Sequence, residues 1–151
     1  MDRKIYRNAI TQEDASVLIK NNYKGDKLLE IENPIVSKLL DMIKDDFDFT
    51  LHPNSRINTE VVKGGHAWHI DRGTYESGKE GHMSWCTVGV SILLSDESQF
   101  QGGDTFYGED QNGLNKIKVD RNQYDMCVHT SDVWHMVESH EGFRHVLLMF
   151  I

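Results

Sequence analysis

The sequence predicts a mainly β protein with N-terminal helices, in which a β-sandwich or open barrel forms the core and the helices pack outside it. Two observations carry this prediction. Helical periodicity occurs in the first third of the 151 residues, and from about residue 56 short apolar runs alternate with turn signals. The length suits a single domain, 1–151, with a helical layer over about 8–46 and a β core over about 56–151.

Two helices are expected in the N-terminal third. Thr11 is a good N-cap, because it precedes acidic residues and apolar residues then recur at helical spacing, which predicts a helix over about 12–22. Gly25 marks the break that follows. Pro34 suits the first turn of a second helix, over about 34–46, which carries its own apolar stripe.

The remainder of the chain contains eight strand-like runs separated by turn signals such as Gly64-Gly65. These runs cover residues 57–62, 66–71, 86–94, 104–107, 115–119, 124–129, 133–138 and 143–151. The segment 72–85 between two of them is polar and contains glycine. A loop of that length in a small domain is typical of a lid or binding loop, in which Tyr75 and Trp85 are candidates to line a substrate entrance.

Composition excludes several classes of protein. The apolar fraction of 38% and the charged fraction of 26% are ordinary for a globular chain. No run approaches the roughly 20 apolar residues that cross a bilayer, and the first residues show no secretory signal, so we expect a cytoplasmic protein without a membrane partner. The net charge of -8 argues against a nucleic-acid partner. Cys86 and Cys127 lie in apolar runs and are expected to be buried free thiols.

His69-Ile70-Asp71 is the first motif that suggests chemistry. Residues i and i+2 of a strand point to the same face, so the imidazole and the carboxylate would lie side by side as two neighbouring metal ligands. Alone the pair is a weak signal, and a surface strand with two polar residues explains it equally well. A third ligand elsewhere in the chain is needed to make the interpretation specific.

His135 is the candidate for that third ligand, because its apolar neighbours predict a buried strand. A lone histidine in such a strand is more often a hydrogen-bonded core residue than a ligand. Together with His69 and Asp71, however, it completes the two-histidine, one-carboxylate facial triad of non-haem Fe(II) oxygenases. That triad leaves coordination positions open for a chelating oxo-acid and O2.

Arg144 stands at the head of an apolar C-terminal run, which is typical of a central strand. A hairpin turning near Ser139-His140 would place Arg144 directly opposite His135 and on the same face. A planar guanidinium is suited to the far carboxylate of 2-oxoglutarate. The alternative is a solvated arginine near the end of the chain.

The ordered set of these residues resembles the prolyl-4-hydroxylase-like branch of the Fe(II)/2-oxoglutarate-dependent oxygenase superfamily. HMVESHEGFRHVLLMF, residues 135–150, is similar to the branch's distal histidine, following valine, Gly-x-Arg and apolar final strand. VGVSILLSDESQFQGGDTF, residues 88–106, resembles its apolar strand, acidic turn and Gly-Gly-acidic-Thr-x-Phe element. ITQEDASVLIKNN, residues 10–22, looks like its entry helix. The resemblance covers most of residues 8–151.

This resemblance implies a double-stranded β-helix (jelly-roll or cupin-like) core and a dioxygenase that hydroxylates a C–H bond. The implied cofactors are Fe(II), 2-oxoglutarate and O2, with ascorbate as a further candidate. Thr105 becomes a candidate second contact to the oxo-acid, although a strand-filling role is equally consistent with it. The sequence departs from the branch by lacking a tyrosine in residues 58–62, for which Thr59, Thr87 or Ser91 would have to substitute.

Other interpretations remain open at this stage. The branch implies a protein or peptide substrate, with proline as the leading case, but amino acids and other small molecules are alternatives. A cupin-like metalloenzyme that does not use 2-oxoglutarate, and a non-catalytic module on the same fold, are the two rival classes. The remaining histidines fit no standard zinc spacing, and each is expected to lie away from the metal; they are His66, His82, His129, His140 and His145.

Overall fold

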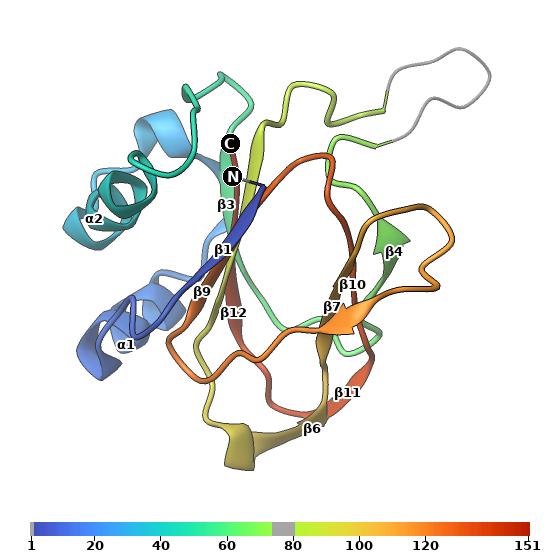
Figure 1. Ribbon diagram of the computed structural model, residues 1–151. Coiled ribbons are helices and arrows are strands. Elements are labelled where there is room, and N and C mark those ends of the chain that lie inside the picture. The colour runs from blue at the N-terminus through green and yellow to red at the C-terminus, as the bar shows by residue number, and fades with distance from the viewer. Residues whose placement is uncertain (1, 74–80) are drawn as a thin grey trace.

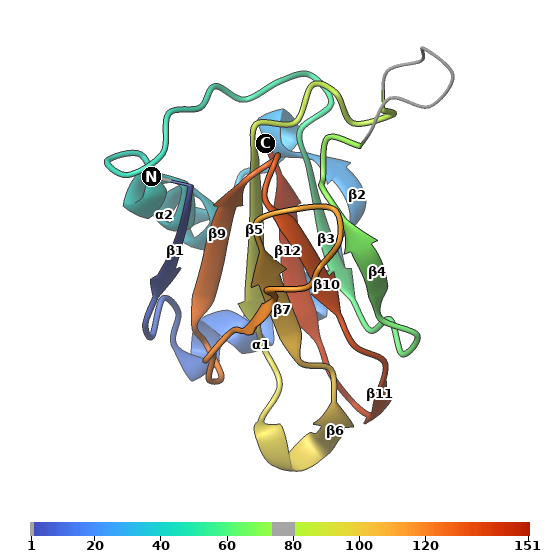
Figure 2. The same cartoon turned by 45° about the vertical axis from the view of Figure 1, so that its right-hand side comes forward.

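The computed structural model describes residues 2–73 and 81–151, and in it two antiparallel sheets enclose an interior space (Figure 1). The larger sheet contains, in spatial order, β1 (Arg3–Tyr6), β9 (Met126–Thr130), β5 (Val88–Leu93), β12 (Val146–Phe150), β3 (Arg56–Glu60) and β2 (Lys24–Lys27). The smaller sheet contains β4 (His66–His69), β10 (Trp134–Val137), β7 (Thr105–Gly108) and β8 (Ile117–Lys118). A two-stranded ribbon, β6 (Phe100–Gly102) with β11 (His140–Gly142), closes one end (Figure 2).

The β-sandwich expected from the sequence is therefore confirmed. Each of the eight expected runs overlaps one strand of the described chain, although most strands are shorter than the runs. The chain passes repeatedly from one sheet to the other, since β3, β5, β9 and β12 belong to the larger sheet and β4, β7, β8 and β10 to the smaller. Residues that are close in sequence therefore often face each other across the interior.

The two expected helices are present as α1 (Gln12–Asn21) and α2 (Pro34–Ile43), and two short 3-10 helices, η1 (Leu28–Glu30) and η2 (Glu97–Gln99), accompany them. Thr11 caps α1 in a capping box: its hydroxyl accepts from the backbone N–H of Asp14, and the Asp14 carboxylate accepts from the N–H of Thr11, both at 3.1 Å. Among the described residues, neither helix has the length and apolar character needed to cross a membrane.

The N-terminal layer is less purely helical than expected, because β1 and β2 are interspersed with the helices and join the two edges of the larger sheet. β1 pairs with β9 and β2 pairs with β3. Both are edge strands rich in charged residues, and all four residues of β2 are exposed. Edge strands of this kind carry no alternating apolar pattern, which is why the sequence did not reveal them.

The hydrophobic core lies between the two helices and the outer face of the larger sheet (Figure 1). Strand alternation decides which residues join it. On β12, Leu147 and Met149 are completely buried in this core, whereas Leu148 and Phe150 point to the opposite face and line the interior between the sheets. The same alternation places Ser91 of β5 on the interior face. One face of the sheet thus stabilises the fold, and the other forms the wall of a cavity.

Candidate metal centre and anion pocket

The two histidines of the expected triad lie directly opposite each other on neighbouring strands. His69 ends β4 and pairs with His135 of β10, and Asp71 follows two residues after His69. The potential ligand atoms of the three side chains all lie within 4.8 Å of one another. Oδ1 of Asp71 is 3.4 Å from Nε2 of His69 and 3.2 Å from Nε2 of His135. The structure therefore gathers the three side chains around one point.

Backbone carbonyls orient both imidazole rings toward that point. Nδ1 of His69 lies 2.5 Å from the carbonyl of Ala67, and Nδ1 of His135 lies 2.9 Å from the carbonyl of Val133. A carbonyl oxygen only accepts, so Nδ1 carries the proton in each ring. Each Nε2 is then left with its lone pair directed at the centre, as metal ligation requires.

His129 is a site residue that the sequence analysis did not select. Its Nε2 lies 2.6 Å from Oδ2 of Asp71, and its Nδ1 lies 2.9 Å from the hydroxyl of Tyr107. Because a carboxylate only accepts, Nε2 donates to Asp71 and the Tyr107 hydroxyl donates to Nδ1. A sequence signal existed: His129 is the fourth residue of the apolar strand MCVHT, at a position that alternates with the core residues Met126 and Val128.

The charges of this centre suit a divalent cation. Burial acts to raise the pKa of Asp71, but the hydrogen bond donated by His129 and the closeness of the His135 and His69 rings outweigh it and hold that pKa far below its usual range. Burial lowers the pKa of His129, and the neighbouring His135 adds to the effect. The centre therefore combines an ionised carboxylate with imidazole nitrogens in a buried position, a donor set suited to Fe(II) and to other first-row metals.

Gly89 of β5 lies directly beneath the contact between Asp71 and His129. A Cβ at Gly89 would lie 2.6 Å from Nε2 of His129 and even closer to Oδ2 of Asp71. Such a Cβ would force the Asp71 carboxylate or the His129 ring out of its present position. The glycine is therefore required by the close approach of these two side chains.

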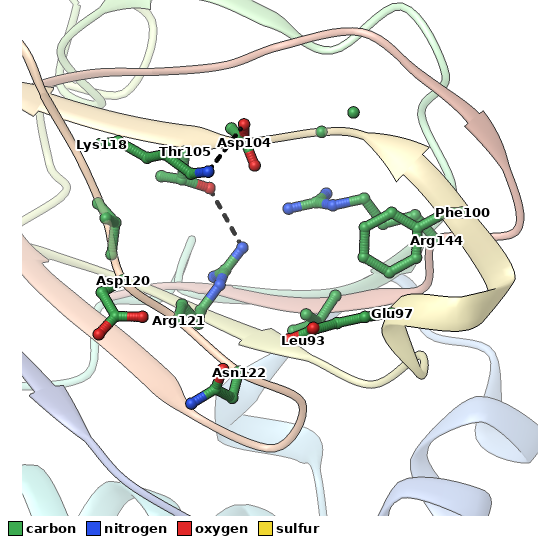
Figure 3. Close-up of a pocket in the computed structure, with 13 residues that line it drawn as sticks. Leu93, Glu97, Phe100, Asp104, Thr105, Lys118, Asp120, Arg121, Asn122 and Arg144 are labelled. Carbon is green, nitrogen blue, oxygen red and sulfur yellow. Dashed lines mark hydrogen bonds and ion pairs between the residues drawn. The ribbon is translucent and has the colours of Figure 1, made fainter.

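The interior holds three connected spaces. The inner cavity, about 70 Å³, extends from the triad to Ser91, Thr105 and Arg121. A smaller recess beside it contains Arg144 and shares with the inner cavity the lining residues His66, Ser91, Val137 and Leu148. An outer cleft of about 420 Å³, shown in Figure 3, is reached by Arg144, Arg121 and Thr105 from the other end.

Arg144 is buried, with only 5% of its surface exposed. Its Nε has no hydrogen-bond partner, and no residue that the structure describes forms an ion pair with it. The guanidinium carbon lies 5.9 Å from the centre of the Phe100 ring. Burial and the nearby charge of Arg121 lower the pKa of Arg144 to about 10, so it stays charged at neutral pH.

The hairpin expected to place Arg144 opposite His135 was wrong. β10 pairs with β4 and β7 of the smaller sheet, β11 pairs with β6, and Arg144 precedes β12, which lies in the other sheet. The two residues therefore belong to opposite walls of the interior. Gly103 allows the arginine to fit, because a Cβ there would lie 2.6 Å from Cδ of Arg144 and 2.7 Å from its Nε.

Thr105 is buried at the start of β7, and its hydroxyl accepts from Nη2 of Arg121 at 3.2 Å. The three hydroxyls considered as substitutes for the missing tyrosine have different surroundings. Thr59 donates to the carbonyl of Leu18 on the helical side, and Thr87 is exposed and lines none of the cavities. Ser91 alone of the three lines the inner cavity.

A mouth cleft of about 750 Å³ opens at the triad and includes His69 and Asp71 among its lining residues. Trp68 and Trp134 also line it and stack on each other with ring centroids 6.2 Å apart. Trp85, expected at a substrate entrance, instead stacks on the ring of His52 and does not line this cleft.

Tyr75 and half of the expected lid loop 72–85, residues 74–80, lie outside the described residues. The other histidines, with the exception of His129, have no contact with the triad carboxylate: His66 pairs with Glu60 at 2.9 Å, and His140 and His145 lie away from the metal centre. His82 lines the mouth cleft without joining the ligand group. Both cysteines are buried and free, as expected.

Comparison with known proteins places the fold. No family model matches the chain, and no curated protein sequence matches it. Among solved structures, the viral collagen prolyl hydroxylase of Paramecium Bursaria Chlorella virus-1, in its 2OG complex, is similar with a TM-score of 0.63 and 10% identity, over 99% of this chain and 94% of that one. A 2OG-Fe(II) oxygenase family oxidoreductase from Burkholderia pseudomallei gives 0.61 and 12%, over 99% and 83%.

A third similar structure is the prolyl hydroxylase of Trichoplax adhaerens in complex with a peptide fragment of the hypoxia inducible factor oxygen degradation domain. Its TM-score is 0.63 at 12% identity, over 99% of this chain and 82% of that one. At these identities the likeness establishes the fold. The resemblance to the Fe(II)/2-oxoglutarate oxygenases and their prolyl-hydroxylase-like branch, stated from the sequence, is thus confirmed as a resemblance of fold.

Proposed function

We propose that the protein is a single-domain Fe(II)- and 2-oxoglutarate-dependent dioxygenase that hydroxylates a C–H bond, built on a double-stranded β-helix. The proposed iron ligands are His69, Asp71 and His135. Arg144 binds the far carboxylate of 2-oxoglutarate, and Thr105 lies at the same end. The observation that carries this proposal is the pairing of a two-histidine, one-carboxylate cluster with a buried arginine that lacks an acidic partner.

The residues fit a metal with open coordination positions. Two Nε2 atoms and Oδ1 of Asp71 converge from one side, and His129 occupies the second carboxylate oxygen, which favours one-oxygen ligation. The hydrogen bonds to the outer nitrogens of both histidine ligands keep their rings in place before a metal binds. When bound, Fe(II) with 2-oxoglutarate and O2 supplies the oxidation of a C–H bond, with release of succinate and CO2.

The protein contributes orientation and exclusion of water. A buried guanidinium without a counter-ion is costly unless an anion neutralises it, so Arg144 favours a carboxylate in the adjoining space. Val137 and Leu148 line both the inner cavity at the triad and the recess that contains Arg144, and their apolar side chains disfavour water there. The mouth cleft at the triad is large enough for a side chain of a peptide.

We further propose a protein or peptide side chain as the substrate, as in a prolyl hydroxylase. The similar Trichoplax adhaerens structure contains a peptide fragment, which supports this class. The stacked pair Trp68 and Trp134 offers an apolar surface beside the triad, suited to an extended peptide. The acidic chain favours a neutral or basic peptide.

The decisive experiment is an anaerobic Fe(II) titration with and without 2-oxoglutarate, in which the visible charge-transfer band of the chelate is recorded. Wild-type protein is expected to form the band. His135→Ala should lose it through loss of iron, and Arg144→Ala should lose it at matched co-substrate concentration, with affinity reduced by about tenfold or more. Lys38→Met, which removes an exposed charge from α2 on the helical side of the larger sheet, is the control.

Each outcome of this titration favours one class of protein over the others. Iron binding without the band would favour a metalloenzyme that does not use 2-oxoglutarate. Absence of metal binding by folded protein would favour a non-catalytic module. Formation of the band, followed by peptide-dependent succinate release, would support the dioxygenase with a peptide substrate.

A further inference from the structure

Two arginines, rather than one, reach the end of the interior that is distant from the mouth cleft. Arg121 lies in the loop between β8 and β9, and Arg144 precedes β12, so they enter from different segments. Figure 3 shows both guanidinium groups reaching into the same space beside Thr105. Arg121 lines both the inner cavity and the outer cleft, so it stands between the triad and the solvent on that side.

Acidic residues do not neutralise this pair. Among the described residues, neither Arg121 nor Arg144 forms an ion pair. The two carboxylates whose charges act on Arg144 each have another partner: Asp104 pairs with Lys118 at 3.3 Å, and Glu60 pairs with His66 at 2.9 Å. Asp120 lies 3.6 Å from an Arg7 nitrogen. Glu97, at the rim of the outer cleft, is exposed. Two like charges held near each other, with no acid paired to either, are stabilised when an anion binds between them.

Arg121 also organises the two hydroxyls of this space. Its Nη1 donates to Oγ of Ser91 at 2.7 Å, and its Nη2 donates to Oγ1 of Thr105 at 3.2 Å. A hydroxyl that accepts from a guanidinium still has its own O–H to donate. Both hydroxyls line the inner cavity, so their protons are available to a carboxylate that enters it from the triad side.

We propose that Arg121 is a second anion-binding residue of the co-substrate site. The far carboxylate of 2-oxoglutarate is then bound by two guanidinium groups, with Ser91 and Thr105 donating from the walls. This inference rests on the proposed function, and it adds a specificity-determining residue to it. The hydroxyl and guanidinium donors take the place of the tyrosine that the sequence lacks.

The consequence is a strong selection for a dicarboxylic oxo-acid. A monocarboxylic oxo-acid of the same chain length chelates a metal equally well, but it leaves both guanidinium groups without a negatively charged partner. Sites built for a buried charge reject an uncharged analogue strongly, because their own groups remain unsatisfied. Arg121 should therefore contribute to binding of 2-oxoglutarate and not to binding of 2-oxopentanoate, in which a methyl group replaces the far carboxylate.

Anaerobic calorimetry of the Fe(II)-loaded protein with these two ligands tests the inference. In Arg121→Met, binding of 2-oxoglutarate is expected to weaken by about tenfold or more, while the affinity for 2-oxopentanoate stays unchanged. Arg121→Lys retains the charge and should recover part of the loss. Lys38→Met removes an exposed charge from α2, on the helical side of the larger sheet, and it should bind both ligands like the wild type.

The possible results distinguish a failure of the inference about Arg121 from a failure of the proposed function. Equal weakening of both ligands in Arg121→Met would show a purely structural role, and unchanged affinity for both would place Arg121 outside the site; either result overturns the inference. If the Met variant does not fold, Arg121→Lys serves alone, and 2-oxoglutarate affinity equal to wild type would overturn it. Failure of the wild-type Fe(II) protein to bind 2-oxoglutarate would overturn the proposed function itself, whatever Arg121 does.

Discussion

His129 donates from Nε2 to Oδ2 of Asp71 at 2.6 Å, and this contact fixes which carboxylate oxygen faces the two histidines of the triad. With Oδ2 occupied, Oδ1 alone faces the Nε2 atoms of His69 and His135. Tyr107 in turn holds His129 through Nδ1. A chain of buried hydrogen bonds thus runs from β7 through β9 to the proposed ligand, and it provides the first prediction.

Replacing His129 by leucine should weaken metal binding by about 10–100-fold, because partners that hold a ligand carboxylate contribute that much to metal affinity. His129→Gln retains a donor and should restore part of the affinity, which a merely space-filling role would not explain. Anaerobic Fe(II) titration measures the effect. His145→Leu is the matched control, since His145 forms no side-chain hydrogen bond in the part of the chain described. Equal affinities in the His129→Leu and control variants would contradict the prediction.

Gly89→Ala should abolish metal binding while leaving secondary structure in place. The added methyl group would collide with Oδ2 of Asp71 and Nε2 of His129, so the carboxylate must turn away from the other ligands. Circular dichroism and metal titration together provide the measurement. Gly64→Ala is the control, because a Cβ there meets no atom within 4 Å. Metal binding by folded Gly89→Ala at wild-type strength would show that the site can relax around the methyl group.

Gly103→Ala should weaken the binding of 2-oxoglutarate without changing the binding of the metal. A methyl group at this position would displace Cδ and Nε of Arg144 and so move the guanidinium, while the triad remains distant. We expect wild-type Fe(II) affinity together with 2-oxoglutarate affinity weakened by about tenfold or more. Gly25→Ala imposes a similar backbone strain, with φ +75° against +73°, but its Cβ meets only Asn58 at 3.7 Å. If both variants lose 2-oxoglutarate equally, strain rather than displacement of Arg144 is responsible.

Asp125 provides a prediction on stability and pH. Burial acts to raise its pKa, but the backbone N–H groups of Asn122 and Asn8 and the Arg7 guanidinium outweigh burial and lower the pKa below its ordinary 3.8. A lowered folded-state pKa stabilises the protein above pH 3.8, and this stabilisation is lost as the pH falls through the folded value.

Asp125→Asn should therefore reduce the free energy of unfolding by about 1–3 kcal/mol at pH 7, as expected for disrupting hydrogen bonds to a buried charge. The difference from wild type should shrink as the pH falls below the ordinary carboxyl pKa of 3.8. Urea unfolding of the metal-free protein at several pH values checks both statements. Asp48→Asn, at an exposed position, should have no effect. A difference independent of pH down to complete acid unfolding would rule out the charge as the cause.

Local pattern predicted both α-helices, eight of the strands and the three side chains that the structure gathers into one cluster. Thr11 and Pro34 marked the helix starts because capping and first-turn preferences are local. His69 and Asp71 lie side by side because strand geometry alone places residues i and i+2 on one face. His135 needed the assumption that its strand neighbours theirs, and the smaller sheet does bring it opposite His69.

The other site residues depended on contacts that no local pattern describes. His129 was expected to lie away from the metal, since nothing near it in sequence indicates that Asp71 lies across the interior. Arg121 stands in a loop between short strands, with no apolar pattern to show which way its side chain points. Arg144, a candidate from its place before an apolar run, is buried in the structure, but its expected hairpin neighbour was wrong because its strand joins the opposite sheet.

The sequence by itself therefore determined both α-helices, eight of the strands, and the choice of His69, Asp71, His135 and Arg144 as candidate site residues. These follow from periodicities of two and 3.6 residues and from the chemistry of single side chains. Only the tertiary structure decided that His129 holds the carboxylate and that Arg121 joins Arg144 at the far end. The reason is physical: these residues come from segments far apart in the sequence, and the path of the chain between the two sheets is set by the packing of the whole core.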